Sequence, residues 1–142
     1  MKISDIGSVS CSEEEGYIEL FFWIKWTSDA GSAPSSGTLK LFSGSEDSYF
    51  ESDLTNLLGS SGEWTNTTLQ VGSNQGWTST GSPDWESITG IEFSLEWADA
   101  ENLTMTIDGL FFSTYLSPIE ALGVSGAILY LFVSVAFSVA MN

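Results

Sequence analysis

The segment Tyr17–Trp26 reads YIELFFWIKW and carries the strongest strand pattern in the sequence. Its side chains alternate with a period of two, which is the period of a β-strand. One face of this strand is apolar throughout and comprises Ile18, Leu20, Phe22, Ile24 and Trp26. The opposite face also carries large rings, at Tyr17, Phe21 and Trp23. We therefore expect one face in a core and the other face covered by something else.

Two later segments alternate in the same way. Ile91–Trp97 places Phe93 and Leu95 on an apolar face, and Leu103–Ile107 does so with Met105 and Ile107. Gly109 then interrupts the alternation before Leu110, which is typical of a β-bulge. Short strands separated by frequent turn residues, with no amphipathic helical pattern before residue 117, predict an all-β antiparallel sandwich over residues 1–116.

The last residues of the chain, 117–142, form a second part. Ala121–Asn142 contains no charged side chain and ten Leu, Ile, Val or Phe residues. About twenty residues of helix span the hydrocarbon core of a bilayer. We expect a C-terminal anchor helix that enters a membrane or the apolar core of an assembly. Its anchoring side chains are expected to be Leu122, Ile128, Leu129, Leu131, Phe132, Val135 and Phe137.

Charge and composition exclude several functions. The formal net charge is −16, and the chain has neither Arg nor His. The charge argues against a nucleic-acid partner, because neutralising phosphates requires Lys and Arg. Histidine-dependent catalytic triads and histidine-based metal sites are excluded because the chain contains no histidine. Glu92 and Glu96 share a strand face, but residues four apart on a strand lie about 13 Å apart, outside the spacing of a glycosidase pair. We therefore expect no enzyme, with a carboxylate glycosidase built from different strands as the remote alternative.

The last third of the predicted sandwich carries a resemblance to a known family. Its pattern runs through Pro83, Asp84, Trp85, Ile88, Ile91 and Phe93, and then through Leu103–Phe112 with Ile107, Asp108, Gly109 and Leu110. This pattern resembles the closing strands of galactose-binding-like jelly rolls, and Trp64, Leu69 and Val71 look like the strand before them. The resemblance covers roughly Tyr17–Phe112 and implies a jelly roll. Such folds serve as carbohydrate-binding modules and as domains of surface and virion proteins.

Asp108 is a candidate calcium ligand, because jelly rolls often hold a structural calcium at such a place. Hard oxygen ligands suit that ion, and Glu13, Glu14 or Glu15 could complete the set. The alternative is a turn aspartate that binds nearby backbone amides. No cofactor is otherwise required.

The six tryptophans divide into core and surface candidates. Trp26, Trp64 and Trp97 are expected in the core. Trp77 lies in a loop rich in Gly, Ser and Thr, and Trp23 lies with Tyr17 and Phe21 on the second face of the strongest strand. These four residues, Tyr17, Phe21, Trp23 and Trp77, are the candidates for a ligand or partner surface. An exposed aromatic stripe without a polar cluster favours a protein interface over a sugar site.

Together these features predict a non-catalytic structural or surface protein, a component of a virion or a similar assembly. Its partners would be other protein subunits, including copies of itself, and a membrane or assembly core. The alternative is a lectin-like module that binds glycans. The N-terminal residues lack the apolar core of a signal peptide. A membrane-anchored protein on a virion or cell surface is expected, and a cytosolic tail-anchored protein is the alternative.

Overall fold

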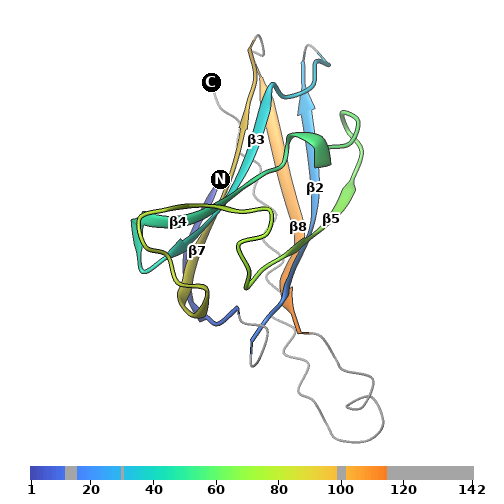
Figure 1. The fold of residues 1–142 in the computed structure, drawn as a ribbon. Helices are drawn as coiled ribbons and strands as arrows, with labels where there is room; N and C mark the ends of the chain where they lie inside the picture. Colours follow the sequence, from blue (N-terminus) through green and yellow to red (C-terminus); the bar gives the residue numbers. More distant parts are fainter. Residues whose placement is uncertain (12–15, 30, 99–101, 115–142) are drawn as a thin grey trace, which may run out of the picture.

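The computed structural model describes residues 1–11, 16–29, 31–98 and 102–114. These residues form eight strands and two short 3-10 helices (Figure 1). The strands are β1 (Lys2–Val9), β2 (Glu19–Ser28), β3 (Ser36–Ser43), β4 (Ser45–Asp53), β5 (Thr65–Gln70), β6 (Thr78–Thr80), β7 (Ile88–Glu96) and β8 (Leu103–Ser113). The 3-10 helices are η1 (Thr55–Leu57) and η2 (Trp85–Ser87).

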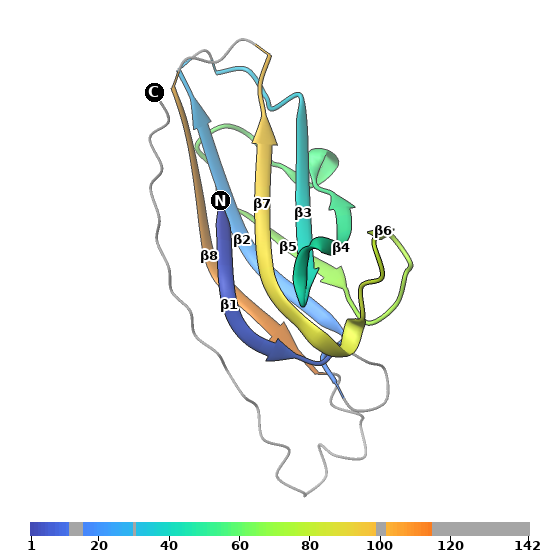
Figure 2. The same ribbon diagram turned by 90° about the vertical axis from the view of Figure 1, so that its left-hand side faces the viewer.

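The strands form two antiparallel sheets that face each other. One sheet has the order β1-β7-β3-β4-β6 and the other has the order β5-β2-β8. Figure 2 shows the two sheets as layers, with β1 and β8 at the same edge of the molecule. The predicted all-β architecture of packed antiparallel sheets is confirmed for the described residues.

The core lies between the sheets, where the predicted apolar faces meet. Phe22 of β2 contacts Phe93 of β7 edge to face, with ring centroids 5.0 Å apart. Six of the expected interior residues are buried, namely Leu20, Phe22, Ile24, Trp26, Phe93 and Ile107. The other three, Ile18, Leu95 and Met105, are half-buried. The two-residue period therefore identified the inner face of three strands.

The predicted bulge at Gly109 is also confirmed. Trp23 pairs with Asp108 while Phe21 pairs with Phe111, so β8 uses one residue more than β2 over this interval. Gly109 has φ of +59°, in the left-handed region that glycine enters without steric cost. The extra residue restores the outward direction of Phe111, which would otherwise point into the core.

Strand β1 was not predicted, because its apolar residues do not alternate. Its register against β7 jumps from Ser4 opposite Gly90 to Val9 opposite Ile88, so β1 is widely bulged. Asp5 and Gly7 have positive φ values of 62° and 78° within this bulge. As a result Ile3, Ile6 and Val9, spaced three apart, all point inward.

The segment before β7 contains one short helix and one short strand. Asp84 caps the short helix η2, since its Oδ1 accepts a hydrogen bond from the Glu86 amide at 2.9 Å. The loop expected around Trp77 contains the short strand β6, which pairs with β4 at the sheet edge. A three-residue strand of Thr and Ser has no apolar alternation by which it could be recognised.

The predicted anchor helix lies outside the described residues, as do its side chains Leu122, Ile128, Leu129, Leu131, Phe132, Val135 and Phe137. Within residues 1–11, 16–29, 31–98 and 102–114, no helix has the length and apolar character needed to cross a membrane. The boundary expected at residue 116 therefore stays a prediction.

The single cysteine, Cys11, belongs to the core. It is fully buried, and its amide donates a 2.7 Å hydrogen bond to the Trp85 carbonyl. Burial disfavours the charged thiolate and raises the pKa of the Cys11 thiol to about 12 from an ordinary 9.0. The contribution of the protonated thiol to the free energy of unfolding is therefore fully present below about pH 9. It is lost as the pH rises toward 12.

We predict that Phe22→Ala lowers the free energy of unfolding by about 3–5 kcal/mol, because it leaves a cavity beside Phe93. Phe21→Ala, at the neighbouring outward position, should cost clearly less. Urea unfolding of the full chain, followed by tryptophan fluorescence, measures both. Equal losses for the two variants would contradict the assignment of the inner face.

We also predict that Cys11→Ala flattens the alkaline decline of stability. Raising the pH from 8 to 10.5 should cost the native chain roughly 2 kcal/mol more than the variant, since the unfolded thiol ionises and the folded thiol does not. Lysine and tyrosine ionise in both chains, so their effects cancel. Parallel pH dependences in the two chains would show that the thiol titrates normally when folded.

Candidate functional site

The outer face of the three-stranded sheet carries a group of large rings. Phe21 and Trp23 project from β2, Phe111 projects from β8, and Trp64 directly precedes β5. Trp23 is 39% exposed and Trp64 is 42% exposed, values reached by few large apolar side chains among the described residues. We call Phe21, Trp23, Trp64 and Phe111 the outer aromatic face.

The rings of this face pack against one another without becoming coplanar. The Phe21 and Phe111 centroids lie 5.0 Å apart at an interplanar angle of 31°. Phe21 and Trp23 meet edge to face at 6.2 Å and 79°. Edge-to-face pairs are a favoured aromatic geometry, and they hold the rings in fixed directions. The result is a ridged apolar surface instead of a flat one.

Polar side chains border the rings. Asn66 and Thr68 of β5 are exposed and lie opposite Trp23 and Phe21 in the sheet register. On the other side, Asp108 of β8 lies opposite Trp23 and is exposed. Lys25 places its Nζ 4.8 Å from the centroid of the Trp64 ring. The face is thus an apolar centre with a polar rim, which is the usual composition of a protein interface.

The absence of a side chain at Gly109 leaves room for the Trp23 ring. A Cβ atom built at Gly109 would lie 3.2 Å from Cδ1 of Trp23, so the indole ring rests directly on the bulge. A larger residue would have to push the ring away. The bulge therefore turns Phe111 outward and also forms the backbone surface that the Trp23 ring contacts.

The structure separates the four predicted surface residues. Phe21 and Trp23 lie together as expected. Tyr17 does not join them, because it precedes the first residue of β2 and turns toward Phe112, with centroids 5.9 Å apart. The prediction that Trp77 is exposed is wrong. Trp77 is 8% exposed, and its Nε1 donates a 2.7 Å hydrogen bond to the Gln70 carbonyl.

The three tryptophans expected in the core differ in how far they are buried. Trp26 is buried, as expected, and its Nε1 donates to the Gly59 carbonyl at 3.0 Å. Trp97 is half-buried against the Trp26 ring. Placing Trp64 in the core was wrong, because the following residue, Thr65, is the one that pairs with inward-facing Ile24. Strand parity then turns Trp64 outward.

All three lysines of the chain lie over aromatic rings. Besides Lys25, Lys2 lies 4.7 Å from the Phe42 centroid and Lys40 lies 4.5 Å from the Tyr49 centroid. Lys2 also pairs with Glu46, and Lys40 pairs with Glu51 at 3.5 Å. Desolvation opposes the charge on Lys40, but Tyr49 and Glu51 together raise its pKa overall. Lys2 and Lys40 are thus held by neighbouring acids and rings on the five-stranded sheet.

Asp108 is placed as the turn interpretation describes. Its Oδ1 accepts a 2.7 Å hydrogen bond from the amide of Gly109. Glu13, Glu14 and Glu15 lie outside the described residues. In the part of the chain that the structure describes, no group of three His, Cys, Asp or Glu side chains is arranged to hold a metal ion. Calcium binding at Asp108 stays a prediction.

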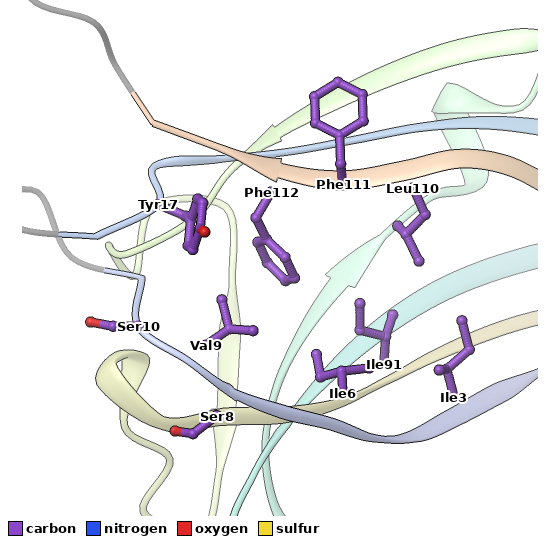
Figure 3. Close-up of a pocket in the computed structure, with 10 residues that line it drawn as sticks. All are labelled: Ile3, Ile6, Ser8, Val9, Ser10, Tyr17, Ile91, Leu110, Phe111 and Phe112. Atoms are coloured by element: carbon purple, nitrogen blue, oxygen red, sulfur yellow. The ribbon is translucent and has the colours of Figure 1, made fainter. Parts of the chain in front are cut away.

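A second feature is an apolar cavity of about 230 Å³ at the edge where β1 and β8 lie opposite each other (Figure 3). Ile3, Ile6 and Val9 point into it from β1, and Leu110 and Phe112 point into it from β8. Tyr17 closes one end, whereas Phe111 points away from the cavity. This cavity could not be anticipated from the sequence, because the apolar residues of β1 do not alternate and β1 was not predicted as a strand.

A third feature is a polar concavity of about 480 Å³ beside η2. Trp85 forms one wall and stacks on Phe50 with centroids 3.7 Å apart and planes within 8°. Its Nε1 donates to Oδ1 of Asn74 at 3.1 Å. Asp84 and Glu86 line the same concavity. These groups offer hydrogen bonds and negative charge, so they suit a neutral polyol better than an anion.

We predict that Gly109→Ala lowers the free energy of unfolding by more than Gly62→Ala does. Both glycines have positive φ, so each alanine should cost about 1–2 kcal/mol for the left-handed backbone. Only at Gly109 does the new methyl group meet another side chain, that of Trp23, whereas nothing lies within 4 Å at Gly62. Urea unfolding measures the difference. Equal losses would show that Trp23 does not rest on the bulge.

No protein-family model, curated protein or solved structure matches this chain. The geometry of the outer aromatic face and of the two concavities is therefore what supports a function.

Proposed function

We propose that this protein is a non-catalytic structural or surface protein whose β-sandwich head binds another protein subunit through the outer aromatic face. The head would be displayed on a virion or cell surface, or on a similar assembly, by the uncharged C-terminal segment acting as an anchor. We also propose that the head belongs to the jelly-roll family that the sequence resembles. Members of that family serve as domains of surface and virion proteins.

The exposure of Trp23 carries this proposal. A tryptophan exposed by 39%, packed edge to face against Phe21 and seated on Gly109, is a rigid apolar group presented to its surroundings. Tryptophan is the residue type most enriched among the few that supply most of the energy of a protein interface. Its position at the middle of β2, the central strand of its sheet, suits the centre of such an interface.

The arrangement of the rings favours protein over sugar at this face. A pyranose stacks on a flat ring surface, whereas Phe21 and Trp23 stand at 79° to each other. A ridged surface of this kind instead interdigitates with side chains of a partner. The exposed uncharged groups Asn66 and Thr68 would form the hydrogen-bonding rim.

We predict that Trp23→Ala weakens subunit association by about 30-fold or more, the loss expected for a central interface tryptophan worth about 2 kcal/mol. Its free energy of unfolding should fall by less than about 1 kcal/mol. Native mass spectrometry or sedimentation of the full chain in detergent measures association, and thermal melting measures stability.

Leu57→Ala is the matched control, because Leu57 is 37% exposed but lies in η1, which belongs to neither sheet. Association should be unchanged in this variant. The proposal fails if Trp23→Ala associates like the native chain. A loss of several kcal/mol of stability in Trp23→Ala would instead show that the ring belongs to the core.

The alternative function is a lectin-like carbohydrate-binding module, and the polar concavity beside η2 favours it. Trp85, Asn74, Asp84 and Glu86 combine an aromatic wall with hydrogen-bonding groups, the combination that orients a sugar. Asn74 and Glu86 are exposed, so alanine at either position should leave the fold intact. Glycan-array binding that is lost in these variants and kept in Trp23→Ala would favour this alternative.

A further inference from the structure

The apolar cavity between β1 and β8 has a lining without a single charged side chain. It is larger than the engineered apolar cavity of about 150 Å³ that takes up benzene. Its volume of about 230 Å³ therefore has room for an aromatic ring together with an aliphatic side chain. A site of this size and chemistry calls for an apolar occupant.

The cavity also lies between two strand edges. β1 ends the order of the five-stranded sheet, and β8 ends the order of the three-stranded sheet. Within the described residues, each of these strands pairs on one side only. A chain segment passing along this edge would find apolar space for its side chains and backbone groups for its amides.

We propose that residues 115–119 of the same chain occupy this cavity. They follow Phe112, which lines the cavity, after only two residues. Their apolar side chains are Tyr115, Leu116 and Ile119, a ring and two aliphatic groups. The next residue, Glu120, is charged and belongs in water, so the docked segment ends before the uncharged stretch begins.

Position and charge favour this occupant over others. A segment tethered two residues from the cavity has a high effective concentration there, which a free ligand must exceed. A second copy must in addition overcome the repulsion between two heads from a chain of net charge −16. The lining adds no cation that would attract a lipid headgroup.

This docking goes beyond the proposed function and adds a consequence to it. A segment fixed between β1 and β8 joins the head to the anchor without a flexible linker. The head would then have one orientation relative to the anchor, and the outer aromatic face would point in one direction. The consequence for orientation rests on the proposed anchor, whereas the docking itself does not.

Disulfide cross-linking in the full chain tests the proposal. In a Cys11→Ala background, Ile6→Cys with Leu116→Cys should form an intramolecular disulfide on oxidation with copper phenanthroline, in detergent and in nanodiscs. Ser4→Cys with Leu116→Cys is the control, because Ser4 lies on the same strand but is exposed and does not line the cavity. We expect the Ile6 pair to react at least ten times faster. Val9→Cys repeats the test at a second lining position.

Equal rates at Ile6, Val9 and Ser4 would overturn the proposal. Disulfides found only between differently tagged chains would also overturn it, because they would assign the cavity to a second copy. A cross-link that forms in detergent and is abolished in nanodiscs would assign the cavity to lipid acyl chains instead. The intramolecular cross-link does not depend on subunit association, so the proposed interface at Trp23 is tested separately.

Discussion

The edge-to-face contact between Phe22 and Phe93 holds the two sheets together at the centre of the core. Phe22 lies on β2, the middle strand of the three-stranded sheet, and Phe93 lies on β7, between β1 and β3. Because side chains alternate along a strand, burying Phe22 commits Phe21 and Trp23 to the opposite face. The aromatic surface is therefore a direct consequence of the core.

The distribution of charge follows the same division between the sheets. The strands of the five-stranded sheet carry seven acids, namely Asp5 on β1, Glu46, Asp47, Glu51 and Asp53 on β4, and Glu92 and Glu96 on β7. Two of the three lysines lie on this sheet and pair with its acids. The strands of the three-stranded sheet carry far fewer acids, namely Glu19 and Asp108. The molecule thus has an acidic side and an aromatic side.

Much of the fold could be predicted from the sequence, because residues with a strict two-residue period reveal which face is buried. Leu20, Phe22, Ile24 and Phe93 were identified in this way, and Gly109 was recognised where the period breaks. β1 was missed for the opposite reason, since its wide bulge spaces Ile3, Ile6 and Val9 three apart. Without β1, the cavity it forms with β8 could not be anticipated.

The site was only partly predictable, since exposure depends on contacts between distant segments. Trp77 lies in a polar loop, yet that loop folds back so that its ring packs against Trp85. Trp64 lies beside a predicted strand with Leu69 and Val71, yet β5 begins at Thr65, which pairs with inward-facing Ile24, so Trp64 one residue earlier faces outward.

The asymmetry of charge has a consequence for association. Repulsion between acidic heads acts over roughly 10 Å and is screened by salt, whereas ring packing acts at contact and is not. Association is therefore least opposed where acids are fewest, which is the side that carries Trp23 and Trp64. The same strand that secures the core at Phe22 presents the surface at which a strongly acidic molecule could meet a partner.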